Sequence, residues 1–212
     1  AFSWSLGGQV LPNEVSPSVV ALGGGTYSVE VTELSTGCTA VAVAEVAVSS
    51  PPLEYSAGVA SGAFAGEHVV VAGVTLGLGQ WEYSIDGGPF QDSGTFPGVS
   101  PGGHLVEISD ALGCGSVQVP VFVVDYPRFV TPNGDGYHDT WSVAGLDGLD
   151  PSARVYVFDR YGKLLKELAP SGPGWDGTFN GAPVPSDDYW FRIEYDQDGA
   201  ARQFTGHFTL KR

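Results

Sequence analysis

The chain has 212 residues, of which 42% are hydrophobic and 16% are charged, and its formal net charge is −15. The apolar fraction is sufficient for packed cores, which excludes a disordered acidic tail, and the length suggests one to three small domains. The acidic excess repels phosphate and argues against nucleic-acid binding, while no apolar run reaches the ~18 residues of a membrane-spanning helix. The first residues, AFSWSLGGQV, lack the basic start of a secretory signal and the chain has no Met, so we expect it to begin within a longer protein.

The charge is unevenly distributed along the chain. Residues 1–126 contain twelve of the 24 acidic residues and none of the nine Lys and Arg, the first of which is Arg128. Residues 127–212 contain the other twelve acidic residues and all nine basic ones. This change in composition predicts a domain boundary near residue 126.

An internal repeat occupies the acidic part. "YSVEVTELSTGC" ends at Cys38 and "HLVEISDALGC" ends at Cys114, and upstream "FSWSL" (residues 2–6) corresponds to "WEYSI" (residues 81–85). Apolar and polar residues alternate within each copy, and Gly- and Pro-rich turns separate the strands, which predicts antiparallel β-sandwiches with the first copy incomplete. Each copy contains one cysteine, which we expect to be a small buried residue beside a turn, although a bridge between copies stays open. These two segments resemble the immunoglobulin-like repeats of large bacterial surface adhesins.

The last part of the chain also predicts strands. "RVYVFDRYGKLLKEL" indicates two strands around a Tyr161-Gly162 turn, the first apolar on both faces and therefore central. "DYWFRIEY" and "QFTGHFTLKR" indicate a hairpin joined at Asp198-Gly199, and an exposed edge at the last strand could be extended by a strand of a partner. The predicted fold is all-β, with serial immunoglobulin-like antiparallel β-sandwiches over residues 1–50, 51–126 and 127–212.

Four blocks then occur in order: "FVTPNGDGYHDTW", "VYVFDRYGKLLKEL", "GWDGTFNGAPVPSDDYWF" and the terminal "GHFTLKR". Together they resemble the gliding motility-associated C-terminal domain, the type B sorting domain of type IX secretion, over roughly residues 125–212. The resemblance implies a secreted adhesin that is extracellular, on the cell surface and associated with the outer membrane. It also implies two partners, the type IX translocon and an outer-membrane β-barrel protein of the PorP/SprF type. The residues that the resemblance marks as the sorting motif are Thr131, Pro132, Asn133, Gly134, Asp135, Gly136, Asp139, Trp141, Asp159, Arg160, Gly162, Trp175, Asp176, Gly177, Tyr189, Trp190, Gly206, Lys211 and Arg212.

The basic residues of this domain distinguish it from the acidic repeats. A sorting domain must present a surface that differs from its passenger, so we expect part of the basic set to contact an acidic partner. The alternative is that these residues pair with acids of their own domain. The set is Arg128, Arg160, Lys163, Lys166, Lys211 and Arg212.

The segment from Asn133 to Asp139 has two interpretations. Asn133, Asp135 and Asp139 stand at relative positions 1, 3 and 7 with glycines between them, a spacing similar to the start of a calcium loop. The alternative is a rigid turn in which the Asn and Asp side chains bond their own backbone and the glycines take positive φ. We expect no other cofactor.

No catalytic motif is present in the sequence. His68, His104, His138 and His207 are expected in separate strands or turns, and neither a nucleophile elbow nor a phosphate loop occurs. We therefore predict that the chain is not an enzyme. The alternative function is a carbohydrate- or protein-binding adhesion module, in which Trp4, Trp81, Trp175 and Trp190 are either sugar-stacking platforms or core residues.

Overall fold

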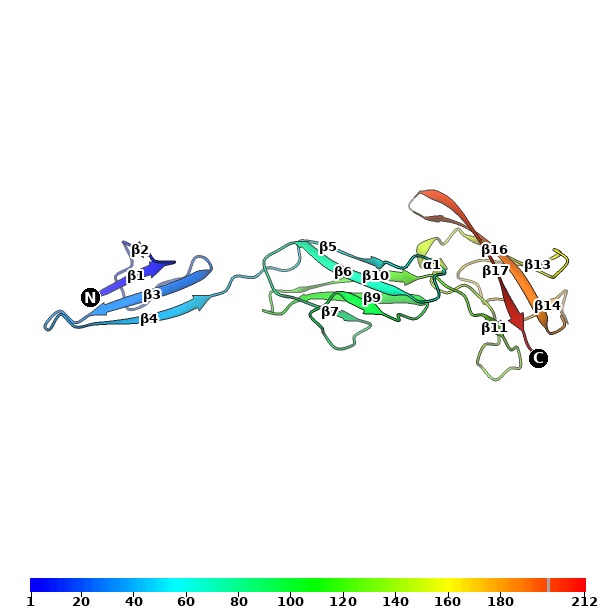
Figure 1. Cartoon of the computed structure of the whole chain (residues 1–212), viewed down its shortest axis with the longest axis horizontal. Helices are drawn as coiled ribbons and strands as arrows, with labels where there is room; N and C mark the ends of the chain where they lie inside the picture. The colour runs from blue at the N-terminus through cyan, green and yellow to red at the C-terminus, as the bar shows by residue number, and fades with distance from the viewer. Residues whose placement is uncertain (198) are drawn as a thin grey trace.

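The computed structural model describes residues 1–197 and 199–212, and it shows three β-rich units in series along an elongated chain (Figure 1). The two termini lie at opposite ends of the molecule. In these described residues the only helix is α1 (Leu146–Leu149), and none is long and apolar enough to cross a membrane.

The first unit is one antiparallel sheet with the order β2-β1-β3-β4. Its strands are β1 (Phe2–Leu6), β2 (Gln9–Leu11), β3 (Gly25–Thr32) and β4 (Thr39–Val46). Trp4 pairs with Val29 and Leu6 pairs with Tyr27, which places these apolar side chains on one face of the sheet. Among the described residues, the two clusters of buried apolar side chains belong to the second and third units.

The second unit is a sandwich of two three-stranded sheets, β5-β6-β8 and β10-β9-β7. Its strands are β5 (Glu54–Val59), β6 (Val69–Leu76), β7 (Trp81–Ile85), β8 (Thr95–Pro97), β9 (Gly102–Asp110) and β10 (Ser116–Val123). Val70 on one sheet and Val106, Ile108 and Val123 on the other are fully buried and belong to one core cluster. The alternation predicted for these strands is therefore confirmed.

The internal repeat is also a repeat of strand pairing. Thr32 faces Thr39 in the β3–β4 pair, and Ser109 faces Ser116 in the β9–β10 pair, both displaced by 77 positions. The order β1-β3-β4 in the first unit corresponds to β7-β9-β10 in the second. The expectation of buried cysteines is wrong, because Cys38 and Cys114 both lie exposed at the tips of these hairpins as free thiols.

The third unit has one five-stranded sheet with the order β11-β17-β16-β12-β13 and a small hairpin, β14-β15. The strands are β11 (Phe129–Val130), β12 (Arg154–Phe158), β13 (Leu164–Leu168), β14 (Thr178–Phe179), β15 (Ala182–Pro183), β16 (Asp187–Gln197) and β17 (Ala200–Leu210). As predicted, β12 is central, because it pairs with β13 on one side and β16 on the other. Loops carry the buried Trp141 and Trp175, and α1 carries the buried Leu146, into the same core cluster as the buried residues of the sheet.

The last two long strands form the expected hairpin, although Asp198 of its turn lies outside the described residues. Tyr189, Phe191 and Ile193 of β16 are buried, whereas Trp190 between them is exposed. The expectation of a free edge along the last strand is wrong at its end. There β11 pairs in parallel with Thr209 and Leu210 and occupies that edge.

Packing places the start of the third unit slightly before residue 127. Val124 belongs to the third unit's core cluster, and Tyr126 packs against the same cluster. The composition change could not reveal this, because neither residue is charged.

Candidate functional site

The loop after β11 is organised around one carboxylate. Asp139 accepts hydrogen bonds from the backbone N–H groups of Asn133 (3.0 Å), Gly134 (2.6 Å) and Gly136 (2.7 Å). These donors, that of Gly134 first, hold the pKa of Asp139 below its ordinary value because they stabilise the charged form. The loop is thus closed around the half-buried, negatively charged carboxylate of Asp139.

Asn133 and Asp135 reinforce the same loop. The Asp135 N–H donates to Asn133 Oδ1 (3.0 Å), and Asn133 Nδ2 donates back to Asp135 Oδ2 (2.8 Å). Asp135 Oδ1 accepts the N–H of Tyr137 at 2.8 Å. Gly134 and Gly136 have φ values of 80° and 90°, which glycine adopts without the steric penalty of a side chain.

These bonds bear on the calcium hypothesis. The oxygens of Asp139 and Asp135, which would coordinate the cation, accept backbone and side-chain donors of the loop itself. Within residues 1–197 and 199–212, no group of three or more His, Cys, Asp or Glu side chains is arranged to hold a metal. Of the two interpretations, this geometry favours the rigid turn.

Trp141 and Trp175 lie in the core and not on a recognition surface. Their backbones exchange two hydrogen bonds of 2.8 Å, so the loops that carry them are joined. The Trp141 ring stacks on Phe208 with centroids 4.1 Å apart, and the Trp175 ring meets Tyr189 edge-on at 5.0 Å. Their indole N–H groups donate to carbonyls within the domain, which satisfies the polar atom of each ring. A sugar-stacking role for Trp175 is therefore wrong.

The turn between β12 and β13 carries three motif residues. Asp159 accepts the N–H groups of Tyr161 and Lys163, both at 2.9 Å, and Gly162 has a φ of 80°. Arg160 forms an ion pair with Asp187 at the start of β16, and the hydrogen bond to that carboxylate raises the pKa of Arg160. The turn is thereby fixed to the neighbouring strand.

The end of β17 is attached to the β14-β15 hairpin by Arg212. Its guanidinium donates to the carbonyls of Gly177 (2.8 Å) and Val184 (3.2 Å), and its backbone N–H donates to Ser186 Oγ (3.0 Å). Asp176 accepts both the N–H (3.0 Å) and the hydroxyl (2.7 Å) of Thr178, and the hydroxyl bond is the main reason that the pKa of Asp176 is lowered.

Three further motif residues, Gly206, Gly177 and Tyr189, allow or fix close contacts within the domain. A Cβ on Gly206 would lie 2.7 Å from the Phe191 ring and 3.0 Å from Tyr126 Oη, so only glycine allows this approach. A Cβ on Gly177 would lie 2.5 Å from Leu210. Buried Tyr189 donates its hydroxyl to the Pro185 carbonyl (2.7 Å), and burial raises its pKa. Thr131 and Pro132 join β11 to the loop, where the Thr131 N–H donates to the His138 carbonyl at 2.7 Å.

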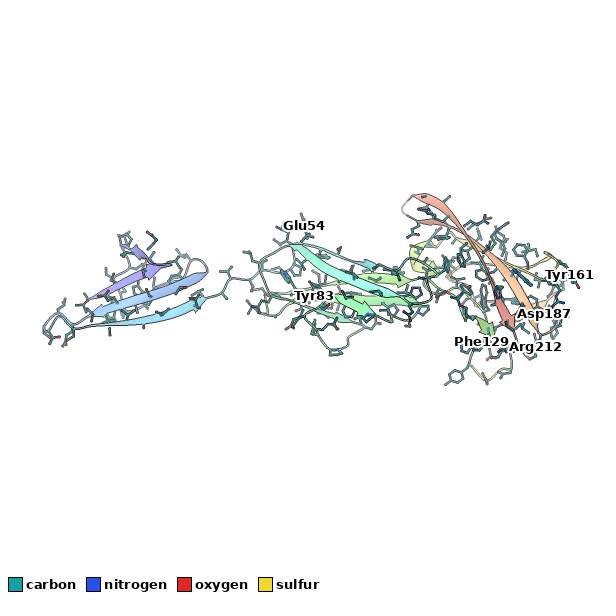
Figure 2. All side chains as sticks on the ribbon, viewed as in Figure 1. Glu54, Tyr83, Phe129, Tyr161, Asp187 and Arg212 are labelled. Atoms are coloured by element: carbon teal, nitrogen blue, oxygen red, sulfur yellow. The ribbon has the colours of Figure 1, made fainter. Side chains whose placement is uncertain are left out.

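Exposed residues of the four sequence blocks lie toward the far end of the domain. Figure 2 shows Tyr161, Asp187 and Arg212 toward the end opposite to the repeats, with Phe129 nearer the middle of the domain. Tyr161 is 86% exposed and Tyr137, at the tip of the Asp139 loop, is 77% exposed. Neither tyrosine was predicted as a site residue. The sequence did contain a signal that could have identified them. Each tyrosine stands in a turn motif whose geometry does not require an aromatic side chain.

The basic set has several partners within the domain. Arg128 lies 3.6 Å from the Asp125 carboxylate and over the Tyr126 ring, in addition to the Arg160 pair. The ammonium of Lys163 lies 4.2 Å from the centre of the Phe179 ring, and that of Lys211 lies 5.3 Å from Phe129. Such exposed contacts leave the charges available to solvent.

Trp190 is the tryptophan that the structure leaves accessible in this domain. It is 44% exposed on the outer face of the five-stranded sheet. A hollow of about 350 Å³ beside it is lined by Phe158, Arg160, Arg192 and Thr205 among others. Trp4 and Trp81 of the repeats are half-buried.

Residues 124–210 match the family described as CHU_C, the Type IX secretion signal domain. The C-terminal domain belongs to this family. A type IX secretion signal domain implies a secreted protein, extracellular or on the cell surface, that interacts with the secretion machinery. The match covers the loop around Asp139, the core tryptophans and the final hairpin, so the family motif and the packed domain coincide.

Solved structures are similar over most of the chain at low identity. The three N-terminal domains of the Hoc protein of bacteriophage RB49 share 10% identity and a TM-score of 0.33, covering 99% of this chain and 87% of that one. The FN1-FN3 domains of chicken CNTN1 share 10% identity and a TM-score of 0.29, covering 100% and 91%. An I-band fragment of titin shares 12% identity and a TM-score of 0.26, covering 100% and 88%. No curated protein matches the chain.

Proposed function

We propose that the chain is part of a cell-surface adhesin, in which the acidic repeats form a stalk and the signal domain directs export through the type IX translocon. An outer-membrane β-barrel protein of the PorP/SprF type then retains the protein at the surface. One observation carries the proposal. The family match, the four sequence blocks and the third packed core all fall within the same residues after a series of immunoglobulin-like repeats.

The proposed mechanism is recognition of a folded end of the domain. Tyr137 and Tyr161 project from two turns that are rigid because Asp139 and Asp159 bind their backbones. Buried motif residues such as Trp141 and Trp175 fix the positions of those turns from inside. Preordered turns lose little conformational entropy on binding, which favours recognition.

The distribution of basic residues supports this end of the signal domain as the recognition surface. The repeats contain no Lys or Arg, whereas this end of the signal domain carries Lys163, Lys211 and Arg212. The two lysines are exposed and lie over aromatic rings, and among the described residues neither forms an ion pair with a carboxylate. We propose that they contact an acidic surface of the export or anchoring machinery.

The decisive test compares export in a bacterium with a working type IX system and in its translocon-deficient derivative. The full chain should reach the surface only in the first strain, and deletion of residues 124–212 should abolish this. Grafting residues 124–212 onto an inert periplasmic passenger should move that passenger outward. Full surface yield of the deleted chain would overturn the proposal.

A second candidate function is carbohydrate binding, which the exposed Trp190 favours. Its ring lies beside the hollow lined by Arg160, Arg192 and Thr205, and aromatic rings with nearby polar groups are suited to sugar stacking. A glycan array probed with the full chain and with Trp190→Ala distinguishes the candidates. Binding that disappears in the variant would support adhesion at this face.

A further inference from the structure

The junction between the second repeat and the signal domain is packed and hydrogen bonded. Strand β10 ends at Val123, and the next two residues, Val124 and Asp125, are buried. The Val124 carbonyl accepts the N–H of Phe64 from the repeat at 2.9 Å, and the Asp125 carbonyl accepts the N–H of Ala144 at 2.9 Å. The chain therefore passes between the two units without a free linker.

A residue of the repeat contributes to the core of the signal domain. Phe64 lies in the segment between β5 and β6, yet its ring stacks on Phe204 of β17 with centroids 4.0 Å apart and planes at 14°. It also meets Tyr195 edge-on at 6.1 Å and lies 6.3 Å from Tyr126. Ala63 and Phe64 both pack against the third unit's cluster of buried residues.

The backbone at Phe64 is strained to make this contact. Its φ is 61°, in the left-handed region that bulky side chains avoid, and Gly62 and Gly66 on either side have φ values of 79° and 81°. Such a conformation persists only where surrounding contacts determine it. Here those contacts belong to the signal domain.

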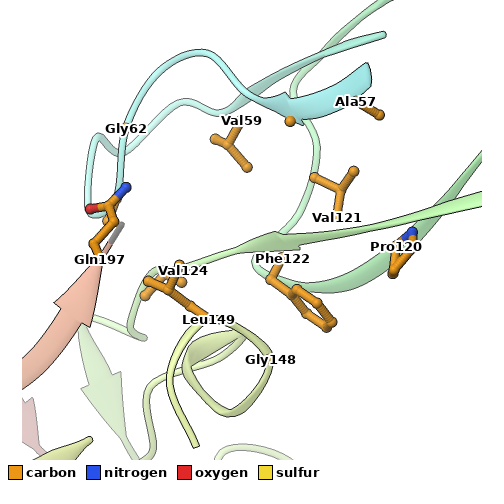
Figure 3. A pocket seen from close by; sticks show the side chains of 12 residues that line it. Ala57, Val59, Gly62, Pro120, Val121, Phe122, Val124, Gly148, Leu149 and Gln197 are labelled. Atoms are coloured by element: carbon orange, nitrogen blue, oxygen red, sulfur yellow. The ribbon is translucent and has the colours of Figure 1, made fainter. Parts of the chain in front are cut away.

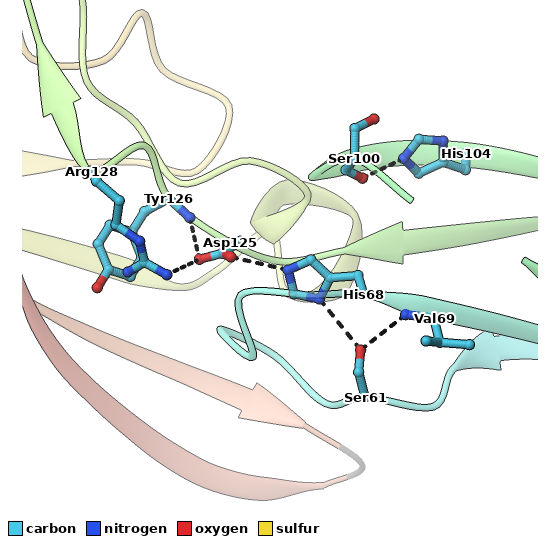
Figure 4. A network of polar contacts seen from close by, with 8 residues as sticks. All are labelled: Ser61, His68, Val69, Ser100, His104, Asp125, Tyr126 and Arg128. Atoms are coloured by element: carbon cyan, nitrogen blue, oxygen red, sulfur yellow. Dashed lines mark hydrogen bonds and ion pairs between the residues drawn. The ribbon is translucent and has the colours of Figure 1, made fainter. Parts of the chain in front are cut away.

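A polar network reinforces the junction (Figure 4). His68 of the repeat is 2% exposed, and its Nε2 lies 3.0 Å from a carboxylate oxygen of Asp125, which is 5% exposed. His68 Nδ1 lies 3.4 Å from Ser61 Oγ, while the other oxygen of Asp125 accepts the Tyr126 N–H at 2.8 Å and lies 3.6 Å from Arg128. Loss of His68 would leave Asp125 Oδ2 without this buried partner, and loss of Asp125 would do the same to His68 Nε2, which is costly away from water.

Helix α1 closes the other side of the junction. A Cβ on Gly148 would lie 2.0 Å from the Phe122 ring of β10, so glycine is required for the helix to pack this closely on the repeat. Beside this contact, Val59, Phe122, Leu149 and Gln197 line a hollow of about 430 Å³ between the units (Figure 3). Contacts thus surround the junction from both units.

We propose that the second repeat is an intramolecular partner of the signal domain. Residues 61–68, here called the joint segment, complete the aromatic core at Phe204 and bind the buried Asp125. The signal domain and the repeat consequently unfold together and keep one relative orientation. This inference concerns the folding of the chain and is independent of the export machinery.

Hydrogen exchange of the full chain, followed by mass spectrometry, tests the coupling. Phe64→Ala should raise exchange in residues 187–210 by roughly tenfold or more, although the substitution lies in the other unit. Phe64→Leu, which keeps most of the volume, should raise it less. Phe90→Ala, an exposed phenylalanine of the same repeat, is the matched control and should leave residues 187–210 unchanged. A change confined to residues 54–123 in both Phe64 variants would overturn the proposal.

Two further comparisons address the individual contacts. Phe64→Ala and Phe204→Ala remove the same stacking pair, so their combined effect on exchange should be smaller than the product of the single effects. His68→Gln should accelerate exchange in residues 125–144, whereas His104→Gln, at the Asp86 pair within the repeat, should not. Multiplicative effects of the phenylalanine pair, or equal effects of the two histidine variants, would contradict a shared core.

Discussion

The carboxylate of Asp139 accepts the backbone N–H of Gly134 at 2.6 Å, and this contact closes the loop after β11 in the signal domain. The aspartate accepts three backbone N–H groups of this loop, those of Asn133, Gly134 and Gly136, and Tyr137 is left as the projecting side chain. The rigidity of the loop therefore depends on the charge of Asp139.

We predict that Asp139→Asn destabilises the chain in a pH-dependent manner. Because the pKa of Asp139 in the folded state is lowered from 3.8, its stabilisation is present above that value and is lost as the pH falls through the folded pKa. The melting temperature of the variant should therefore lie below that of the parent near neutral pH, and the two should converge in acid. Asp92→Asn, an exposed acid of the repeat, serves as the control, and an Asp139→Asn difference that stays constant in acid would contradict this role.

Calcium should not bind the Asn133–Asp139 loop with measurable heat. The oxygens of Asp139 that would coordinate the ion are already acceptors for the Asn133, Gly134 and Gly136 N–H groups, so a calcium ion would compete with these bonds. Calorimetry on the full chain with calcium, and with magnesium as a comparison, measures this. A calcium-specific heat that disappears in Asp139→Asn would restore the calcium interpretation.

Strands whose apolar residues alternate with polar ones, or are continuous, could be predicted from the sequence. The alternation in Tyr189, Phe191 and Ile193 identified the buried face of β16, and the apolar Val155 and Val157 identified a central strand. Motif blocks identified the family, because several of their residues are required by turns or close contacts, as at Gly206 and Gly177.

Contacts between units could not be predicted. Nothing in the sequence around Phe64 or His68 indicates that their partners are Phe204 and Asp125, since those pairings depend on how two separately patterned units meet. The same limit applies to Trp141 and Trp175. A motif shows that a residue matters without showing whether it faces the core or the solvent.

Replacing Gly206 by Ala should destabilise the signal domain by about 1–3 kcal/mol, the usual range for an overpacked core. The added methyl group would press on the Phe191 ring and Tyr126 Oη, both of which are held by further aromatic neighbours. Gly73→Ala in β6 is the matched control, because its Cβ would meet nothing within 4 Å. Urea denaturation measures both, and equal midpoints for the two variants would contradict the close packing at Gly206.

The two tryptophans of the third block, Trp175 and Trp190, should differ strongly in the effect of truncation. Trp175→Ala should cost about 3–5 kcal/mol, as expected for a large buried aromatic residue, and should reduce export through loss of folding. Trp190→Ala should change stability by much less, because its ring is 44% exposed. Comparing the two by denaturation and by surface yield shows whether a loss of export in Trp190→Ala reflects recognition, since its stability stays near that of the parent.

Charge reversal at the end of β17 should weaken attachment without unfolding the domain. Lys211→Glu removes an ammonium that lies over the Phe129 ring but keeps the backbone bond from Lys211 to Val130. Arg212→Glu also removes the bonds to Gly177 and Val184, so it combines a charge effect with a local structural one. Arg212→Gln separates these contributions, because it removes the charge while retaining a donor.

Surface retention, measured as the cell-associated fraction of exported protein, should fall in Lys211→Glu while the melting temperature stays constant. If retention and export are unchanged in both reversals, the acidic-partner hypothesis is wrong for these two residues, and their role is confined to holding β17 against β11 and the β14-β15 hairpin.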